Sequence, residues 1–366
     1  MSYKFDCLKT NISFVWQLLN SSTCERKRAL YYGWLGFKNL GDEALFYCIE
    51  EMFKDRLTFN TSGELDRLYF SEKALSSFDV HFIGGGTLIN RNETTIDTLL
   101  KYRGKIPKAI ALGTGVANEE FWQQFEERRD RSNDWRDYLN SCQFVGVRGP
   151  DSLRYMQQLG VPKALVTGDP VLYLGRDTIV KKSQRKRIGL NFGNTKNKLW
   201  GKSDQHVEDE MAILIRILLE KNWEISFFNV YVDDTKAYYN FVDRNGLNGK
   251  IRFFDASDCS MATALDYFDT IDVFVGEKLH ASVFAACTYT PFIMLEYRPK
   301  CLDFMRSIGY EKYNIRTDKI TADEVYNSVE ELYQASEGIQ IFLKEKVLYH
   351  KNLLVSSSKN IIGEVP

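Results

Sequence analysis

The sequence alternates short runs of β-branched and aromatic residues with segments whose apolar residues recur at helical spacing. The first example is the run Ala29–Trp34, followed from Asp42 by a segment in which apolar residues return at i, i+4, i+7 and i+8. This alternation predicts an α/β fold with parallel sheets, because each helix carries the chain back to the start of the next strand. A chain of 366 residues exceeds one ordinary core, so we expect two domains.

The expected strands fall into two series. The first series is Ala29–Trp34, Asp79–Ile83, Lys108–Leu112, Gln143–Val147 and Ala164–Thr167, with helices from Asp42 and from an Asp151 N-cap to Gly160. The second series is Ile188–Phe192, Glu224–Tyr231, Lys250–Phe254, Ile271–Val275 and Pro291–Tyr297, with helices at Val207–Lys221, Thr235–Asn245, Met261–Phe268 and Ala281–Cys287. A mostly helical tail is expected from Thr321 to about Leu354.

A polar stretch, Arg176–Arg187, separates the two series. Its cations Lys181, Lys182, Arg185 and Lys186 predict a solvated linker more than a nuclear-localisation or nucleic-acid segment. We therefore expect an N-terminal Rossmann-like domain over residues 1–180, a C-terminal Rossmann-like domain over 181–330 and a helical tail over 331–366. Ligands of such sheets bind at the carboxyl ends of the strands, so the two domains should face a common cleft.

Composition excludes several classes of protein. The chain has 48 Lys+Arg against 49 Asp+Glu, without the basic excess typical of a nucleic-acid binder. No apolar run approaches the roughly 20 residues of a membrane span, and the N-terminus lacks the pattern of a signal peptide. The seven cysteines are scattered without a C-x-x-C pair, so we expect buried, reduced thiols and neither disulfides nor zinc. These features predict a soluble cytoplasmic protein.

The segment Gly33–Glu43 joins the first strand to the first helix. It superficially resembles a phosphate-binding loop, but Asp42 and Glu43 stand where Lys and Ser or Thr are needed, and their carboxylates repel phosphate. Two interpretations remain: a tight turn with an Asp N-cap, or a polar loop whose Asn39 and Asp42 bind a neutral hydroxylated ligand.

Two further strand ends are rich in glycine. Gly84, Gly85 and Gly86 follow the second strand, and three glycines exceed what a simple turn needs, which favours a cleft-lining role. Thr114 lies between two glycines after the third strand and is expected at the same edge. We expect these residues to line the acceptor side of the cleft.

His280 is the strongest catalytic candidate. It follows a buried strand and Gly276, and it begins a helix whose free N–H groups favour an anion. Lys300 and Arg298 follow the next strand, and Arg148 ends a strand of the first domain, so these cations are expected to converge with His280. By contrast, His81 is expected in the core, and His206 and His350 in solvent. The sequence contains no H-E-x-x-H, G-x-S-x-G or D-x-D motif, and no metal is expected.

Taken in order, these segments resemble the polysaccharide pyruvyl transferase family over about residues 29–310. The matching segments are Tyr32–Gly33, Asn39–Ala44, Gly84–Gly86, Gly113–Gly115, Val147–Ser152, Gly168–Pro170, Gly276–His280, and Tyr297–Lys300 with Phe304 and Gly309. The resemblance implies a two-domain fold of the GT-B kind that transfers pyruvate from phosphoenolpyruvate to sugar hydroxyls as a cyclic ketal, with the acceptor on the N-terminal domain, Arg148 at the cleft, and the donor on the C-terminal domain. It implies a catalytic role for His280 and Arg148, and donor binding by Arg148, Gly276, Lys278, Leu279 and Lys300. Lys278 stands where the family usually has Arg, so a point charge replaces a bidentate fork there.

The chemistry agrees with these residues. Phosphoenolpyruvate carries a carboxylate and a phosphate and needs about two or three cationic groups, while one histidine can move the protons. The expected partners are phosphoenolpyruvate as co-substrate and a sugar acceptor of a surface polysaccharide, lipid-linked acceptors at the inner membrane surface included. No cofactor, nucleic acid or membrane segment is expected. The alternatives are a GT-B glycosyltransferase that uses a nucleotide sugar and a non-catalytic carbohydrate-binding protein.

Overall fold

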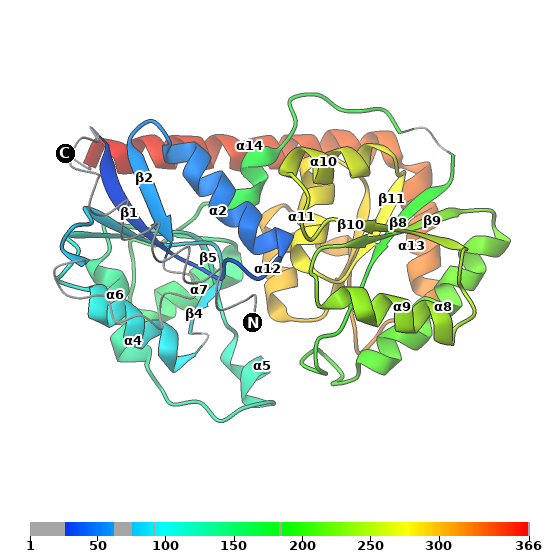
Figure 1. The fold of residues 1–366 in the computed structure, drawn as a ribbon, viewed down its shortest axis with the longest axis horizontal. Coiled ribbons are helices and arrows are strands. Elements are labelled where there is room, and N and C mark those ends of the chain that lie inside the picture. Colours follow the sequence, from blue (N-terminus) through cyan, green and yellow to red (C-terminus); the bar gives the residue numbers. More distant parts are fainter. Residues whose placement is uncertain (1–25, 62–74, 91, 183–184, 365–366) are drawn as a thin grey trace, which may run out of the picture.

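The computed structural model describes residues 26–61, 75–90, 92–182 and 185–364, which form two parallel sheets side by side (Figure 1). The first sheet contains β1 (Lys27–Tyr32), β2 (Leu57–Thr61), β3 (Val80–Ile83), β4 (Gly86–Ile89), β5 (Lys108–Val116), β6 (Phe144–Val147) and β7 (Leu165–Val166). Its order is β2-β1-β3-β5-β6-β7, with β4 paired to β5. The second sheet contains β8 (Arg187–Asn191), β9 (Glu224–Asn229), β10 (Ile251–Asp255), β11 (Val273–Gly276), β12 (Phe292–Glu296) and β13 (Asn314–Arg316), in the order β10-β9-β8-β11-β12-β13.

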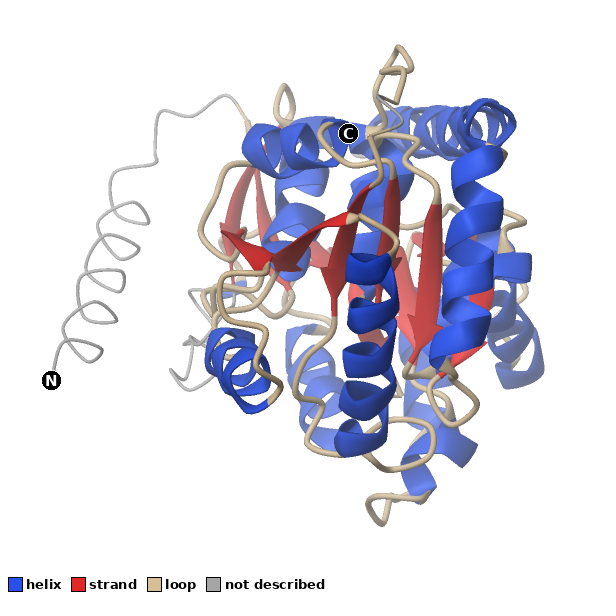
Figure 2. Cartoon of the chain, turned by 90° about the vertical axis from the view of Figure 1, so that its right-hand side faces the viewer, coloured by secondary structure: helices blue, strands red, loops and turns tan. Residues whose placement is uncertain are grey.

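Helices cover the faces of both sheets, as Figure 2 shows for the C-terminal one. Those of the first half are α2 (Leu40–Phe53), α4 (Glu93–Tyr102), α5 (Glu119–Gln123), α6 (Ser132–Ser141), α7 (Pro150–Leu159) and the 3₁₀ turn η2 (Pro170–Leu174). Those of the second are α8 (Asp204–Glu220), α9 (Asp234–Arg244), α10 (Met261–Asp269), α11 (Leu279–Cys287), α12 (Pro299–Ser307), η3 (Glu311–Tyr313), α13 (Ala322–Gln334) and α14 (Ser336–Glu364). Central strands such as β3, β11 and β12 are buried along their whole length, as expected for parallel strands covered on both faces.

The expected α/β architecture is confirmed, and every expected strand is present. The short or edge strands β2, β4 and β13, which pair with β1, β5 and β12, have no clear signal in the sequence. Several helices begin earlier than predicted; α8 begins at Asp204 and α11 at Leu279, not at Val207 and Ala281. Asn39, not Asp42, is the N-cap of α2, and Gly149, not Asp151, precedes the Pro that begins α7. The expected left-handed end of α7 at Gly160 is confirmed.

The C-terminal helix α14 connects the two halves, lying along one side of both sheets in Figure 1. It packs against η2 and α2 of the first half and against α11 and α13 of the second. His350 on this helix is buried, with Nε2 2.8 Å from the carbonyl oxygen of Ser307 and Nδ1 3.4 Å from that of Thr167. The expectation of a solvated His350 is therefore wrong, because the tail is folded back over the strand ends.

Lys182 is not solvated, in contrast to the prediction for the linker that contains it. Its side chain is buried and its ammonium donates to the carbonyl oxygen of Phe268 and to Thr290 Oγ1, at 2.7 and 2.8 Å. Burial lowers the pKa of Lys182 to about 8. His206 is half-exposed, whereas His81 is buried in the core as expected, with Nδ1 2.9 Å from the Tyr138 hydroxyl.

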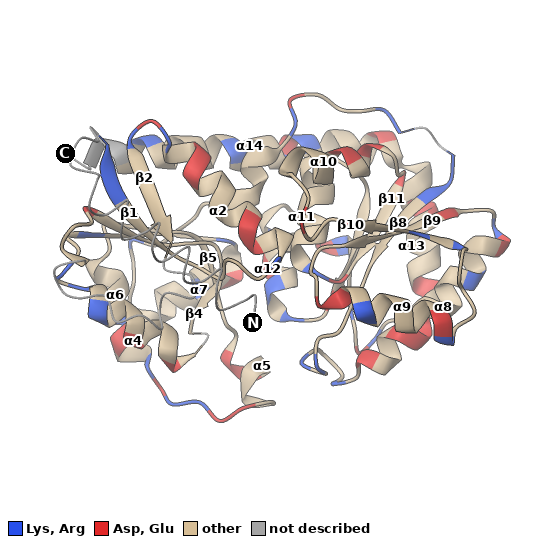
Figure 3. Cartoon of the chain, in the orientation of Figure 1, with Lys and Arg blue, Asp and Glu red and all other residues tan. Residues whose placement is uncertain are grey.

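Acidic and basic residues are intermixed along both halves of the chain (Figure 3). Among the described residues no helix is long and apolar enough to cross a membrane. Cys48, Cys142, Cys287 and Cys301 are buried thiols as expected, and Cys259 is partly exposed. Cys7 and Cys24, like the N-terminal segment in which a signal peptide was considered, lie outside the described residues.

Candidate active site

Arg148 and Asp169 form a buried ion pair at the carboxyl edge of the first sheet. Arg148 directly follows β6, and Asp169 follows β7, where its Oδ1 accepts from the backbone N–H of Val171 and caps η2. Arg148 Nε lies 3.0 Å from Asp169 Oδ2, and the two side chains are 1% and 0% exposed. Strand-end positions bring these two residues together, because β6 and β7 are parallel neighbours.

His280 reaches this pair from the second sheet. It lies in the first turn of α11, and its Nε2 is 3.7 Å from Asp169 Oδ2. On the other side of the ring, a Cβ atom on Gly41 would lie 2.1 Å from Nδ1, so only glycine fits in this first turn of α2. The imidazole is therefore held between the two halves, with Asp169 at one nitrogen and α2 at the other.

Burial and charge oppose each other at Asp169. Burial pushes its pKa up, but the facing His280 and the Arg148 guanidinium outweigh it and hold the pKa of this carboxyl below its ordinary value. Asp169 therefore stays a carboxylate near neutral pH, and it can orient the imidazole and stabilise its protonated form.

Asp42 and Lys300 complete the cluster. Burial raises the pKa of Asp42, against the opposing charges of His280, Lys300 and Arg148. Burial, followed by the charges of Arg298 and Arg148, lowers the pKa of Lys300 to about 7. These mutual effects place both side chains within electrostatic reach of Arg148. The structure therefore brings His280 to Arg148 and Asp169, with Lys300 in electrostatic reach, whereas Arg298 donates to the carbonyl oxygen of Lys198.

The Arg148 guanidinium has no hydrogen-bond acceptor among the described residues. Nε, Nη1 and Nη2 are all buried without a hydrogen-bond acceptor in this part of the chain; Asp169 pairs with Nε at 3.0 Å, and the carboxylates of Asp42 and Asp303 act on the guanidinium from farther away. A Cβ atom on Gly115 would lie 3.5 Å from Cζ and Nη1, so this glycine keeps the space beside the guanidinium open. Thr114 Oγ1, also buried, is likewise without a partner in this part of the chain. Such an arginine is suited to a carboxylate or phosphate from a ligand.

The three consecutive glycines have different surroundings. A side chain on Gly84 would overlap the Tyr31 ring, and one on Gly85 would overlap Leu45, so both allow close packing of β3 on its neighbours. Gly86 has φ +95° and is partly exposed, and a Cβ atom there would meet Asp42 Oδ1 at 3.8 Å. Of the three, Gly86 lies beside the charged cluster.

The other residues that were predicted to bind the donor or acceptor substrate lie apart from the charged cluster or make hydrogen bonds to neighbouring backbone. Asn39 Oδ1 accepts from the Gly41 N–H and caps α2. Leu279 is buried, and Gly276 leaves no room for a side chain beside Ser282. Lys278 is the N-cap of α11 but makes no side-chain cap.

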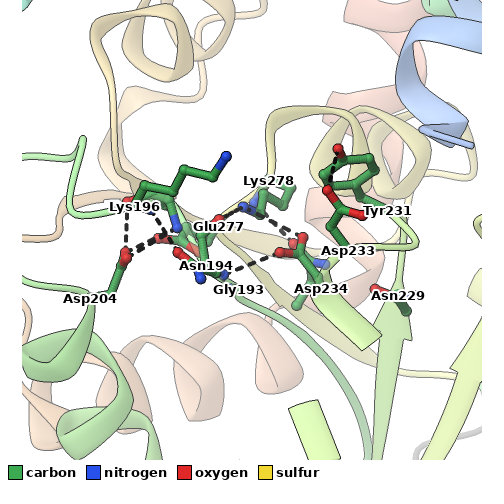
Figure 4. A network of polar contacts seen from close by, with 12 residues as sticks. Gly193, Asn194, Lys196, Asp204, Asn229, Tyr231, Asp233, Asp234, Glu277 and Lys278 are labelled. Atoms are coloured by element: carbon green, nitrogen blue, oxygen red, sulfur yellow. Dashed lines mark hydrogen bonds and ion pairs between the residues drawn. The ribbon is translucent and has the colours of Figure 1, made fainter. Parts of the chain in front are cut away.

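The Lys278 ammonium points to a separate network, drawn in Figure 4. It lies 3.5 Å from Asp234 Oδ2 and donates to the carbonyl oxygen of Asn194 at 3.2 Å. The structure therefore gives Lys278 partners within the C-terminal half, whereas Arg148, Lys300 and His280 lie together.

The loop after β8 belongs to the same network, and carboxylates take its backbone N–H groups (Figure 4). Glu277 Oε2 accepts from Gly193 at 2.8 Å and Asp234 Oδ1 from Asn194 at 3.1 Å. Asp204 accepts from the backbone N–H groups of Thr195 and Asn197. Burial raises the pKa of Glu277 to about 7. The first strand-end loop of the second sheet is thus internally bonded and surrounded by acids.

Two residues of the site were not identified from the sequence. Asp169 lies in a Gly-Asp-Pro segment after a strand, a position that could have marked it as a strand-end carboxylate. Asp303 of α12 gave no such signal. Its carboxylate accepts from the N–H of Asp151 at 2.8 Å and from Ser152 Oγ at 2.6 Å, and so caps α7 of the other half.

Comparisons with known proteins give a family and a fold. A family model described as polysaccharide pyruvyl transferase matches residues 39–299. A search of curated proteins found no match.

Similar solved structures include a glycosyltransferase from Rickettsia africae, with TM-score 0.56, 9% identity, and coverage of 93% of this chain and 99% of that one. A UDP-GlcNAc 2-epimerase from Neisseria meningitidis bound to UDP-GlcNAc has TM-score 0.54, 11% identity and coverage of 93% and 99%. A UDP-glucosyltransferase from Polygonum tinctorium has TM-score 0.54, 12% identity and coverage of 92% and 99%. At these identities the likeness concerns the fold, which is GT-B-like as expected.

Proposed function

Because the chain belongs to the polysaccharide pyruvyl transferase family, we propose that its cleft transfers the enolpyruvyl group of phosphoenolpyruvate to two hydroxyls of one sugar, giving a cyclic ketal and phosphate. The observation that carries this proposal is the buried Arg148 guanidinium, which has no acceptor among the described residues and lies with Lys300 and His280. A small ligand with two anionic groups satisfies such a site.

Arg148 binds one anionic group of the donor through its planar fork, and Lys300 binds the other as a point charge. The positive end of α11, which has no side-chain cap within the described part of the chain, adds to this attraction. Donor binding also raises the proton affinity of Lys300, because it brings negative charge to a lysine whose pKa burial has lowered.

His280 moves the protons. In the first step protonated His280 gives a proton to C3 of the donor, C2 becomes cationic, and the first sugar hydroxyl adds to C2 and loses its proton to the imidazole. In the second step the bond between C2 and the phosphate oxygen breaks, and its electron pair leaves with phosphate. The second sugar hydroxyl then adds to C2, and phosphate takes its proton. Asp169 orients the imidazole, and Asp42 offers a carboxylate to the acceptor hydroxyls.

The nucleotide-sugar alternative finds less support in the C-terminal half. A nucleotide diphosphate at a strand-end loop needs free backbone N–H groups. The N–H groups of Gly193, Asn194 and Thr195 already donate to carboxylates. The non-catalytic alternative gives no reason for the arrangement of Arg148, Asp169 and His280.

Proton NMR tests the proposal directly. The protein is mixed with phosphoenolpyruvate and a panel of free and lipid-linked sugars, and we expect a new ketal methyl signal together with equimolar phosphate. Thermal denaturation supplies a second measurement: phosphoenolpyruvate at about 100-fold over its Kd should add about 2.7 kcal/mol without added metal. Stabilisation by a uridine or cytidine sugar nucleotide, with none by phosphoenolpyruvate, would establish the glycosyltransferase instead.

A further inference from the structure

Three aromatic side chains from both halves gather beside the start of α2. Trp34 lies in the loop after β1 and is 43% exposed. Its ring stacks on Phe37, with centroids 4.8 Å apart and planes at 20°, and meets Tyr231, from the loop after β9, at 5.8 Å and 57°. We call Trp34, Phe37 and Tyr231 the aromatic platform. An exposed tryptophan ring on a small aromatic cluster offers a flat apolar face on which a ligand can stack.

Backbone hydrogen bonds between the halves fix the platform. The Leu40 N–H donates to the carbonyl oxygen of Val230 at 2.9 Å, and the Val232 N–H donates to that of Lys38 at 3.3 Å. These bonds form an antiparallel bridge between Asn39 and Tyr231. The two loops that carry the aromatic rings are therefore joined before any ligand arrives, which lowers the entropic cost of binding.

The platform lies next to the catalytic cluster. The loop that carries Trp34 runs directly into α2, where Gly41 packs on His280 and Asp42 follows. The charge of Asp42 acts on Tyr231: burial, the hydrogen bond to Asp233 and the carboxylates of Asp233, Asp234 and Asp42 together raise the pKa of Tyr231 to about 12. Asp42 is thus in electrostatic reach of both Tyr231 and His280.

The charges around the platform select the chemistry of the ligand. The Tyr231 hydroxyl donates to Asp233 Oδ2 at 2.7 Å, whereas the neighbouring Asp234 is buried and paired with Lys278 (Figure 4). Carboxylates accept hydrogen bonds from hydroxyl groups and repel anions. Indole and phenol rings attract the polarised C–H groups of a pyranose through their electron-rich faces. Aromatic rings bordered by carboxylates match a neutral sugar and oppose an acidic one.

We propose that the aromatic platform is the acceptor subsite, on which a neutral pyranose lies against Trp34 and turns its hydroxyls toward Asp42 and the donor. This inference rests on the proposed function for its reaction, but the sugar-binding surface itself can be tested without turnover.

Saturation-transfer-difference NMR with a panel of neutral hexoses and disaccharides, each with a uronic-acid counterpart, is the test. We expect the wild type to bind at least one neutral sugar and its acidic counterpart more weakly. Trp34→Ala should weaken that binding by tenfold or more, and Trp34→Phe should restore part of it. Tyr47→Ala removes an aromatic ring that is 40% exposed on α2 and should bind like the wild type. Phosphoenolpyruvate affinity, measured by calorimetry, should be equal in all four proteins.

Three outcomes would overturn the platform: wild-type sugar affinity in folded Trp34→Ala, preference for the acidic sugars, or no sugar bound by the wild type. Failure of the proposed function looks different. In that case neutral sugars would still bind in a Trp34-dependent way, but phosphoenolpyruvate would neither bind nor yield a ketal. If ketal formation occurs, Trp34→Ala should raise the acceptor KM and leave the donor KM unchanged.

Discussion

Both sheets are parallel but differ in strand order, and the strand end at Arg148 differs in chemistry from the loop after β8. At the first sheet, Gly86 and Gly115 keep space open and Arg148 has no acceptor among the described residues. At the second, the loop after β8 has its N–H groups bonded to Glu277, Asp234 and Asp204. The N-terminal edge is thus suited to receive an anion, and the C-terminal loop is not. A shared fold therefore fixes where ligands bind, while local side chains decide their charge.

Replacing His280, the catalytic residue that the second half supplies, should have the largest effect. His280→Ala and His280→Gln should lower kcat about 10²–10⁴-fold, because neither side chain can transfer a proton. Donor affinity and melting temperature should change little for Gln, which keeps some hydrogen bonding. Near-normal turnover of the Gln variant would limit His280 to donor positioning, and strongly lowered melting of both variants would make it a structural histidine.

Arg148 tests the anion site of the first half. Removing its charge-assisted contacts should weaken phosphoenolpyruvate binding by about 1.5–3 kcal/mol, or roughly 10–150-fold, in calorimetry. Arg148 is also fully buried against Asp169, so its removal affects packing as well as binding.

Arg148→Ala should therefore also lower stability, by about 3–5 kcal/mol, because it leaves a buried carboxylate unpaired. Arg148→Lys keeps the charge and separates the two effects: it should melt closer to the wild type and still bind the donor weakly. Wild-type donor affinity in the Lys variant would show that the bidentate fork is not used.

Asp303 tests whether the second half positions the first. Asp303→Ala removes the acceptor for the N–H of Asp151 and for Ser152 Oγ, which should cost about 1–3 kcal/mol of stability in chemical denaturation. Because α7 directly follows Arg148, the donor KM should rise more than kcat falls. Asp323→Ala, an exposed acid in the first turn of α13, is the control. Equal effects of both variants would mean that Asp303 does not position Arg148.

The lowered pKa of Lys300 predicts that phosphoenolpyruvate binding depends on pH. Its pKa is lowered to about 7, so its cationic form is lost as pH rises through 7. Phosphoenolpyruvate affinity should therefore weaken by up to about tenfold per pH unit above 7. Lys300→Arg stays cationic throughout this range and should remove the slope, measured by calorimetry between pH 6 and 8.5. A slope that persists in the Arg variant would assign the titration to another group.

The smallest effect is expected from the acidic loop of the second half. Asp204→Ala frees the N–H groups of Thr195 and Asn197 and should lower stability by about 1–2 kcal/mol. Phosphoenolpyruvate affinity should be unchanged, because the hydrogen bonds of Asp204 go to this loop and not to Arg148, Lys300 or His280. A tenfold change in that affinity would contradict the separation of this loop from the anion site.

The sequence by itself determined the architecture and much of the site. Alternating apolar runs and helical periods predicted two parallel α/β sheets, because such periodicity reports directly which residues must be buried. Strand-end logic placed His280 and Lys300 at one edge of the second sheet, since neighbouring parallel strands end together, and placed Arg148 at the facing edge of the first sheet. Asp42 and Gly86 were also found at this edge.

Only the tertiary structure decided how these residues are used. Burial and pairing depend on segments far apart in the chain: Asp303 caps α7 across 151 or more residues, and α14 buries His350 over the strand ends. The same reason applies to Lys278, whose partners Asp234 and Asn194 come from other strand-end segments. Local spacing encodes which face is apolar, whereas the electrostatic partners of a strand-end charge are set by how the two halves dock, which no local pattern contains.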